Sequence, residues 1–329
     1  MVQSRLIEEM DRVTIEWLNK KDFEKRFPTH KENKINLDIP IISNDEEPVH
    51  SQRWKGIMKC YPFTEERLAK WQPPYIIQPK LDGNRAVNKP ITAGSILLSS
   101  EENQYCCLPH LTQQLMDSGL WKIPLDGEMY SHALFKEGGH ELIHSIASAS
   151  RVNIHPRHKE MEFWVFDVKT TQNQSERLAF IVNNLSRLPI SIKVVPFWIC
   201  ETLSEVKYVY DTVIKDGFEG IVIRHLFNKY EEKRSTWVMK FKPKKKDKYK
   251  IIGWNEEVSI HGVPKGRIGS LVLSSQAGDT FAVSAGLDDN DRERLWNIKD
   301  ELAGKDAIVH YQHLTNKHIP KGCFDIEVL

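Results

Sequence analysis

An apolar run that ends in a lysine beside an Asp-Gly pair organises this chain. Residues Tyr75–Val87 contain, in order, apolar residues, a proline, Lys80, the pair Asp82-Gly83, Arg85 and further apolar residues. Asp-Gly between two apolar runs is a strong signal for a β-hairpin. The stretch therefore predicts two strands joined by a tight turn, with Lys80 and Arg85 near the bend.

Lys80 is either a nucleophile or an ordinary solvated lysine of a hairpin. An amine becomes nucleophilic when burial or neighbouring cations lower its pKa. The pattern K-x-D-G is only four positions long and by itself favours the solvated lysine. The rest of the chain has to decide between the two.

Composition limits the classes of protein that need to be considered. A length of 329 residues favours two domains with a short appendage, and the net charge of +1 means that nucleic-acid affinity requires clustered charge. The five cysteines include no C-x-x-C pair, which argues against a disulfide framework and a structural zinc site and fits a reducing compartment. No apolar segment reaches membrane-spanning length, and the N-terminus lacks the apolar core of a signal peptide, so we expect a cytoplasmic protein.

Two acidic residues stand in strand-like, apolar surroundings. Glu128 follows an Asp-Gly pair within Leu125–Tyr130, and Glu219 lies between Phe218 and Gly220 after a third Asp-Gly pair. Glu128 is a surface carboxylate unless partners give its position a meaning. Glu219 stands in a segment too apolar for a casual surface acid, so it needs a partner, and a cation is the usual one. Both are therefore candidate site residues.

Lysines concentrate towards the second half of the chain. Alternation along a strand over 237–243 would place Lys240 and Lys242 on one face, where two ammonium groups repel unless an anion lies between them. Seven lysines fall between positions 240 and 250. The run 244–250 is, with equal weight, a phosphate-binding segment or a solvated linker.

The remaining patterns predict an α+β chain. A rough apolar periodicity predicts a helix over 3–26, followed by a polar linker to about residue 54. Further helices are expected at 64–71, 108–118, 175–187, 204–214 and 288–303, and strands at 95–100, 161–168, 192–199, 220–224 and, in the tail, 249–254, 270–274, 281–284, 306–311 and 324–328. The histidines of 131–158 match no zinc spacing and are expected in loops. Five short strands with one helix suit a small barrel of the OB type.

Five segments, taken in order, resemble the motifs of the covalent nucleotidyltransferases, in the form found in ATP-dependent DNA ligases. They are Lys80–Arg85, Asp126–Glu128, Phe163–Asp167, Asp216–Arg224 and Met239–Pro243. The tail resembles the OB domain of ligases at Gly266–Leu271 and Val283–Asp289. One K-x-D-G is weak support, but five motifs in order are strong, and the match covers roughly residues 56 to 329.

This resemblance implies a fold and its boundaries. A nucleotidyltransferase domain with ATP-grasp-like antiparallel sheets and helices would be followed by a small OB-fold β-barrel. The expected divisions are a helical N-terminal appendage and linker over 1–58, an adenylation domain over 59–243 and an OB-fold domain over 244–329.

The resemblance also implies the chemistry. Lys80 would attack the α-phosphate of ATP and carry AMP, while Lys240 and Lys242 would lower its pKa and hold phosphate. Glu128 and Glu219 would bind Mg²⁺. Phe166 would stack on adenine, Arg85 would hold the ribose or the nick phosphate, and Gln78 would lie by the base edge. The complete nucleotide-binding set is Gln78, Asp82, Arg85, Glu128, Phe166, Glu219, Lys240 and Lys242.

The implied activity is the sealing of 5′-phosphate/3′-hydroxyl nicks in duplex DNA, through a lysyl-AMP and a DNA-adenylate, in replication, repair or recombination. Nicked duplex DNA is the expected partner, without a membrane, and a monomer is expected. The short appendage suggests a compact enzyme of phage, viral or accessory bacterial type, acting in a cytoplasm that could be that of a phage-infected host.

The chain departs from the family pattern in three places. Ser100 stands where an arginine is expected, Gln78 stands where a glutamate is frequent, and the C-terminal motif offers only Lys317 and Lys321 as basic residues. Three alternatives stay open: an RNA ligase or mRNA-capping guanylyltransferase, an NAD-dependent ligase, and a DNA-binding module on an inactive fold. The NAD-dependent class would need a zinc-finger cysteine quartet, which the sequence lacks.

Overall fold

The structure is a computed structural model that describes residues 56–329, except for residues 93, 151, 185–187, 276 and 316–317. The helix predicted over 3–26 and the linker after it lie outside these residues. The chain divides into two compact units, with the break between Phe241 and Lys242. We call the described residues up to Phe241 the first unit and those from Lys242 onwards the second unit.

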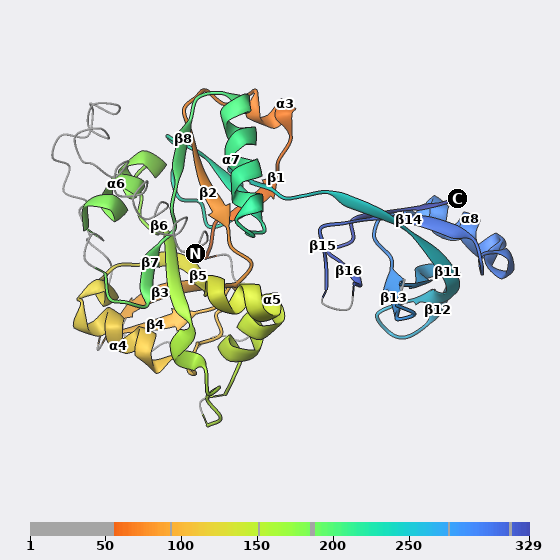
Figure 1. Cartoon of the computed structure of the whole chain (residues 1–329), viewed down its shortest axis with the longest axis horizontal. Coiled ribbons are helices and arrows are strands. Elements are labelled where there is room, and N and C mark those ends of the chain that lie inside the picture. Colours follow the sequence, from red (N-terminus) through yellow and green to blue (C-terminus); the bar gives the residue numbers. More distant parts are fainter. Residues whose placement is uncertain (1–55, 93, 151, 185–187, 276, 316–317) are drawn as a thin grey trace. The chain divides into compact units, whose positions relative to one another are not determined.

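The first unit contains two five-stranded sheets (Figure 1). One sheet has the order β1 (Lys59–Pro62), β10 (Arg234–Phe241), β9 (Gly220–His225), β2 (Tyr75–Lys80) and β8 (Trp198–Cys200). The other has the order β4 (Gly94–Leu98), β3 (Asn84–Ile91), β5 (Leu125–Tyr130), β6 (Glu162–Val168) and β7 (Ile192–Val194). Within each sheet, all neighbours are antiparallel except β1 with β10 and β6 with β7. This is the mixed α and β arrangement expected from the sequence.

The predicted hairpin at Asp82-Gly83 is wrong. Strands β2 and β3 flank this pair, but they belong to different sheets and do not pair with each other. The glycine is required by close packing, because a Cβ on Gly83 would lie 2.3 Å from the carbonyl oxygen of Met129. The Asp-Gly pair therefore marks the crossing from one sheet to the other.

Helices pack against both sheets of the first unit. They are α3 (Glu65–Leu68), α4 (Pro109–Asp117), α5 (His132–Ala147), α6 (Gln174–Asn184) and α7 (Leu203–Lys215), with short 3₁₀ turns η1 (Leu120–Lys122) and η2 (His158–Glu160). Helix α7 packs on β2, β8 and β9, and α5 packs on β3 and β5. The histidine-rich segment was expected to form loops, but much of it forms α5, which is kinked at Gly139.

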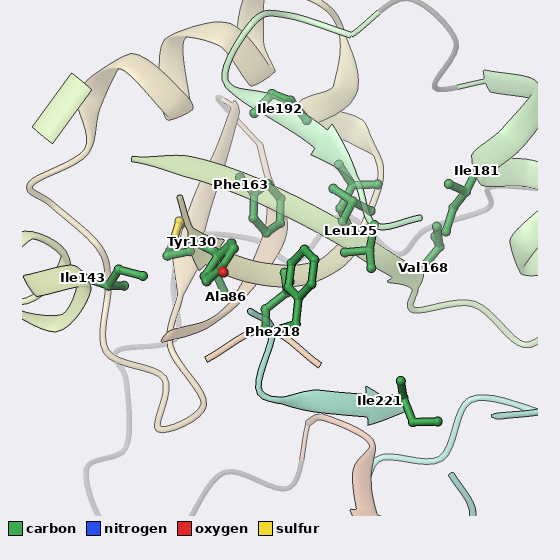
Figure 2. Close-up of a cluster of buried hydrophobic side chains, with 14 of the residues drawn as sticks. Ala86, Leu125, Tyr130, Ile143, Phe163, Val168, Ile181, Ile192, Phe218 and Ile221 are labelled. Atoms are coloured by element: carbon green, nitrogen blue, oxygen red, sulfur yellow. The ribbon is translucent and has the colours of Figure 1, made fainter. Parts of the chain in front are cut away.

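The core of the first unit lies where the two sheets and their helices meet. Figure 2 shows Phe163 and Leu125 from adjacent strands, with Ile192 and Phe218 reaching the same cluster from other parts of the chain. The predicted single strand over 192–199 is divided between β7 and β8, which lie in different sheets. Buried residues of this segment therefore belong to both sheets. The apolar pattern continues across the gap between β7 and β8, so it did not reveal where one strand ends and the next begins.

The second unit is built on one five-stranded antiparallel sheet. Its order is β13 (Thr280–Val283), β12 (Pro264–Ser274), β11 (Lys245–Val258), β14 (Asp306–Tyr311) and β17 (Asp325–Val328). Helix α8 (Asp289–Asn297), the turn η3 (Lys299–Glu301) and a small pair, β15 (His313–Leu314) with β16 (Pro320–Lys321), complete it. The five tail strands and the helix were thus predicted, although several bounds differ.

The predicted OB-type barrel is not confirmed, because the strand pairing closes no barrel among the described strands. Among the described strands, no ladder joins β13 to β17, which lie at opposite edges of the sheet. The run 244–250, which could have been a linker, belongs largely to β11 and pairs with β14. No helix among the described residues is long and apolar enough to cross a membrane.

Candidate active site

Strand pairing brings Lys80 and Glu219 together. Lys80 ends β2 and lies opposite Gly220, the first residue of β9, and the backbone N–H of Glu219 donates to the Lys80 carbonyl at 3.3 Å. The Lys80 Nζ atom donates to Glu219 Oε2 at 2.5 Å. Two predicted site residues that are 139 positions apart in sequence thus form an ion pair.

Glu219 is fixed by the segment that precedes it. Gly217 adopts a positive φ of 88° after α7, and the Phe218 N–H donates to the Val213 carbonyl at 3.2 Å, which is a glycine helix cap. The Phe218 ring is buried in the core, 6.4 Å from the Tyr130 ring (Figure 2). This anchor turns the next residue, Glu219, towards Lys80.

Glu128 completes an acidic environment for the lysine. Burial would lower the pKa of Lys80, but Glu219 and Glu128 raise it overall. Burial raises the pKa of Glu128 to about 7, and Glu219 also acts in that direction. The Lys80 pKa therefore moves opposite to the lowering expected from Lys240 and Lys242, because nearby carboxylates outweigh burial.

Arg85 is held by a buried carboxylate. Its Nε and Nη2 atoms donate to the two oxygens of Asp126, each at 2.6 Å, and Nη2 also reaches the Met58 carbonyl at 3.3 Å. The Tyr230 hydroxyl donates to the same Asp126 at 2.5 Å and accepts from the Met58 N–H at 3.2 Å. Sequence reasoning missed Tyr230, which lies in a loop segment without a recognisable pattern.

Phe166 and Gln78 lie beside two guanidinium groups. The Arg85 Cζ atom is 4.7 Å and the Arg224 Cζ atom 5.2 Å from the Phe166 ring centroid. Gln78 is buried, donates to the Phe166 carbonyl at 3.2 Å and accepts from Arg224 Nε at 2.7 Å. Gln78 thus connects the strand carrying Lys80 to the strand carrying Phe166.

A fully buried ionic network lies behind Phe166. Asp167 accepts from Arg177 Nε at 2.7 Å and from Arg224 Nη1 at 3.0 Å, and Gln174 Oε1 accepts from Arg177 Nη2 at 2.7 Å. Burial would raise the pKa of Asp167, yet Arg177 and Arg224 hold it below its ordinary value. The network joins both sheets to α6. Asp167 and Arg224 end two of the motif segments quoted from the sequence, whereas Arg177 was not singled out there.

The other predicted phosphate-binding residues lie in two units. Lys240 is in β10, opposite Val222 of β9. Lys242 follows the end of that strand, belongs to the second unit and donates from Nζ to Gln312 Oε1 at 2.8 Å. Asp82 lies between β2 and β3 and contributes to raising the Lys80 pKa.

The residues at which the chain departs from the family pattern lie in both units. Ser100 lies in a turn after β4, and Lys321 is in β16. Gln78 is part of the hydrogen-bonded connection described above. Lys317 lies outside the described residues.

Glu128 and Glu219 form a donor set that suits Mg²⁺. This ion prefers carboxylate oxygens and usually completes its shell with water and substrate phosphates. Each of the two carboxylates influences Lys80, and Glu219 raises the pKa of Glu128, so their negative charges are close enough to oppose one another. A divalent cation would relieve that opposition.

Comparisons with known proteins give a consistent result. The family described as "ATP dependent DNA ligase domain" matches residues 57–242, more than half of the chain, whereas no curated protein matches. The structure of a Lig E DNA ligase, described as binding DNA with a minimal scaffold, is 21% identical, with a TM-score of 0.69 over 83% of this chain and 99% of that one. A structure named Pmar-Lig_PreS3 is 17% identical, with a TM-score of 0.68 over 93% of this chain and 69% of that one. At these identities the likeness shows a common fold.

Proposed function

Because the chain belongs to the family of ATP-dependent DNA ligases, we propose that it seals nicks in duplex DNA through a lysyl-AMP intermediate on Lys80. The observation that carries this proposal is the convergence of Lys80, Glu219 and Glu128. A nucleophilic amine and two carboxylates suited to a cation are what transfer of an adenylyl group needs.

The reaction would proceed in three displacements. The neutral Lys80 Nζ atom forms a bond to the α-phosphorus of ATP while the bond to the pyrophosphate oxygen breaks, and Nζ loses a proton. The 5′-phosphate of the nick then takes the AMP as the phosphorus–nitrogen bond breaks. Finally, the 3′-hydroxyl attacks that 5′-phosphate, closes the strand and releases AMP.

The carboxylates near Lys80 must be neutralised before the amine can act. In the protein's own electrostatic field the Lys80 pKa is raised, which favours the unreactive ammonium form. A divalent cation bound by Glu128 and Glu219, which we propose to be Mg²⁺, would cancel their charge and leave burial to lower that pKa. The same carboxylates would thus control both metal binding and the nucleophile.

The remaining set is proposed to bind the nucleotide. Phe166 would stack on adenine, and Arg85, already held by Asp126, would present its guanidinium to the ribose or the nick phosphate. Gln78 would lie by the base edge, and its hydrogen bond to the Phe166 carbonyl would help to hold the residue that stacks on adenine. Asp82 and Lys240 are proposed to complete the site around the phosphates.

The second unit is proposed to be an OB-type domain that contacts DNA. Lys246, Lys248 and Lys250 alternate along β11, so they share one face of the sheet, and all three are exposed. Exposed lysines in a row attract phosphate backbones with strong salt dependence. We propose a monomer that acts on nicked DNA in the cytoplasm during replication, repair or recombination.

Labelling with ATP tests the central step. The protein is mixed with Mg²⁺ and ATP radioactive at the α-phosphate, and nicked DNA with a 5′-phosphate is then added. We expect label on the wild type and on a control, Lys70→Ala, that is removed by nicked DNA, and no label on Lys80→Ala. Label on Lys80→Ala would refute the assignment, and label from GTP, or discharge only to RNA, would favour the capping or RNA-ligase alternatives.

A further inference from the structure

His310, Asp325 and Glu327 place one imidazole and two carboxylates together in the second unit. One donor atom from each residue lies within 4.8 Å of the donor atoms of the other two. None of the three belongs to the set proposed for ATP or DNA. We call this group the His310 cluster.

The register of two strands sets the cluster on one face of the sheet. His310 of β14 lies opposite Asp325 of β17, and Glu327 follows two positions after Asp325, so the three side chains share a face. The alternate residues Val309 and Ile326 point to the opposite face and are buried in the core. A slip in register would expose that core, so the strand pairing itself fixes the donors.

Local contacts hold the donors further. His310 Nε2 lies 3.0 Å from Glu327 Oε1, and the His310 ring meets the Phe324 ring edge-on at 6.0 Å. Asp325 Oδ1 accepts from the Ile326 N–H at 3.0 Å. Gly286, at a φ of 86°, passes so close that a Cβ there would lie 2.5 Å from Asp325 Oδ1. The cluster is therefore built before any ion arrives.

We propose that the His310 cluster binds a first-row divalent cation of the Zn²⁺ type, which fastens the edge strand β17 to β14. Zinc binds nitrogen and oxygen ligands at about 2.0–2.2 Å and arranges them in a tetrahedron. Two ligand atoms of one zinc ion therefore lie roughly 3.3 Å apart. The 3.0 Å between His310 Nε2 and Glu327 Oε1 is close to that spacing. An imidazole ligand favours zinc-like ions over Mg²⁺, which prefers oxygen ligands throughout.

A lysine next to the His310 cluster provides a variant that should strengthen zinc binding instead of weakening it. Lys246 of β11 lies directly opposite His310 on its other side and is exposed. Its positive charge opposes a cation at the His310 cluster. Lys246→Ala should therefore bind Zn²⁺ more tightly, by a few-fold, because the repulsion between exposed charges is modest.

Zinc titration of the full chain tests the proposal. Binding of Zn²⁺ is measured by isothermal titration calorimetry in excess Mg²⁺, which occupies oxygen-only sites. The wild type should bind one equivalent more than His310→Ala, and Glu327→Gln should weaken that equivalent by roughly tenfold or more, since even outer-shell changes cost about 10- to 100-fold. The exposed control His261→Ala should keep it. Equal stoichiometry and affinity in wild type and His310→Ala would overturn the proposal.

Hydrogen exchange supplies a readout independent of stoichiometry. Zn²⁺ should slow exchange of the amides of 325–328 in the wild type and not in His310→Ala. If His310→Ala fails to fold, Lys246→Ala decides: tighter zinc binding supports the site, and unchanged zinc binding refutes it. Unaltered exchange of 325–328 in the wild type would leave His310 and Glu327 as a simple hydrogen-bonded pair.

Discussion

Two charged clusters in the first unit use similar residue types but are balanced in opposite ways. Around Asp167, two guanidinium groups surround one carboxylate, and all are buried and hydrogen bonded. Around Lys80, one ammonium faces Glu219 and Glu128. The pKa of Asp167 is below its ordinary value, whereas that of Glu128 is raised to about 7.

We take this difference to separate a structural network around Asp167 from the proposed reactive site around Lys80. At Asp167 the ionised form is favoured, so the network is stable as the protein builds it. At Glu128 the charged form is disfavoured by burial and by Glu219, so near neutral pH a further cation would favour its ionisation.

Removing Arg177 should destabilise the protein severely. Arg177→Met leaves Asp167 buried with one partner fewer, and the loss of one member of a buried pair costs about 3–5 kcal/mol. Urea unfolding followed by circular dichroism measures the change. Arg157→Met is the matched control, because Arg157 also pairs with two carboxylates but at the surface, and it should change little. Equal losses in the two variants would contradict a special role for burial.

Replacing Glu128 should remove a part of the pH dependence of stability, in a defined direction. Its folded pKa of about 7 exceeds its ordinary value of 4.5, so its contribution to stability is present below pH 4.5 and is lost as pH rises to 7. Glu128→Gln should therefore be more stable than wild type above pH 7, by on the order of 2–3 kcal/mol, and similar below pH 4.5. Thermal unfolding in Mg²⁺-free buffer measures this.

The control for that experiment is an acid with the opposite shift. Hydrogen bonding to Arg157 lowers the pKa of Glu137, so the contribution of Glu137 is lost as pH falls. Glu137→Gln should show no gain above pH 7. A Glu128→Gln variant that is less stable than wild type above pH 7 would mean that the Glu128 charge is already compensated.

Glu219 should set the protonation of Lys80. Burial lowers the Lys80 pKa and Glu219 is the first of the groups that raise it, so Glu219→Gln should lower this pKa without added metal. Carbon NMR titration of methylated lysines, assigned with Lys80→Ala, measures the shift. Glu232→Gln, which removes the ion pair between the exposed Glu232 and Lys169, should leave the Lys80 resonance unchanged. An unchanged or higher Lys80 pKa in Glu219→Gln would show that the 2.5 Å contact is electrostatically unimportant.

A local signal in the sequence singled out Lys80 and Glu219 as candidates. Lys80 follows one apolar run and Glu219 precedes another, and they form an ion pair because β2 and β9 are neighbours. The Asp-Gly pairs misled because one dipeptide can serve three purposes. Gly83 allows a close approach to Met129, Gly127 lies within a strand, and Gly217 caps a helix.

The sequence could not reveal contacts that depend on which elements become neighbours. Asp126 was read as part of an acidic motif, yet its partners Arg85 and Tyr230 lie 41 and 104 positions away. The histidines of α5 and the break between β7 and β8 were missed because a short apolar pattern fits a loop, strand or helix until packing selects one.

Tyr230 connects the Asp167 cluster to Arg85, whose charge acts on Glu128 of the Lys80 cluster, and cutting that connection should have the smallest effect. The Arg177 Cζ atom lies 5.6 Å from the Tyr230 ring centroid, and the Tyr230 hydroxyl donates to Asp126, which holds Arg85. Tyr230→Phe keeps the ring and removes two hydrogen bonds, one to a charged group and one from the Met58 N–H, so we expect a loss of about 2 kcal/mol in urea unfolding. Because Arg85 keeps both bonds to Asp126, labelling by ATP should persist. The exposed Tyr208→Phe should be neutral. If Tyr230→Phe abolishes labelling while remaining folded, the hydroxyl does more than make that connection, and the division between the structural network and the proposed reactive site would have to be redrawn.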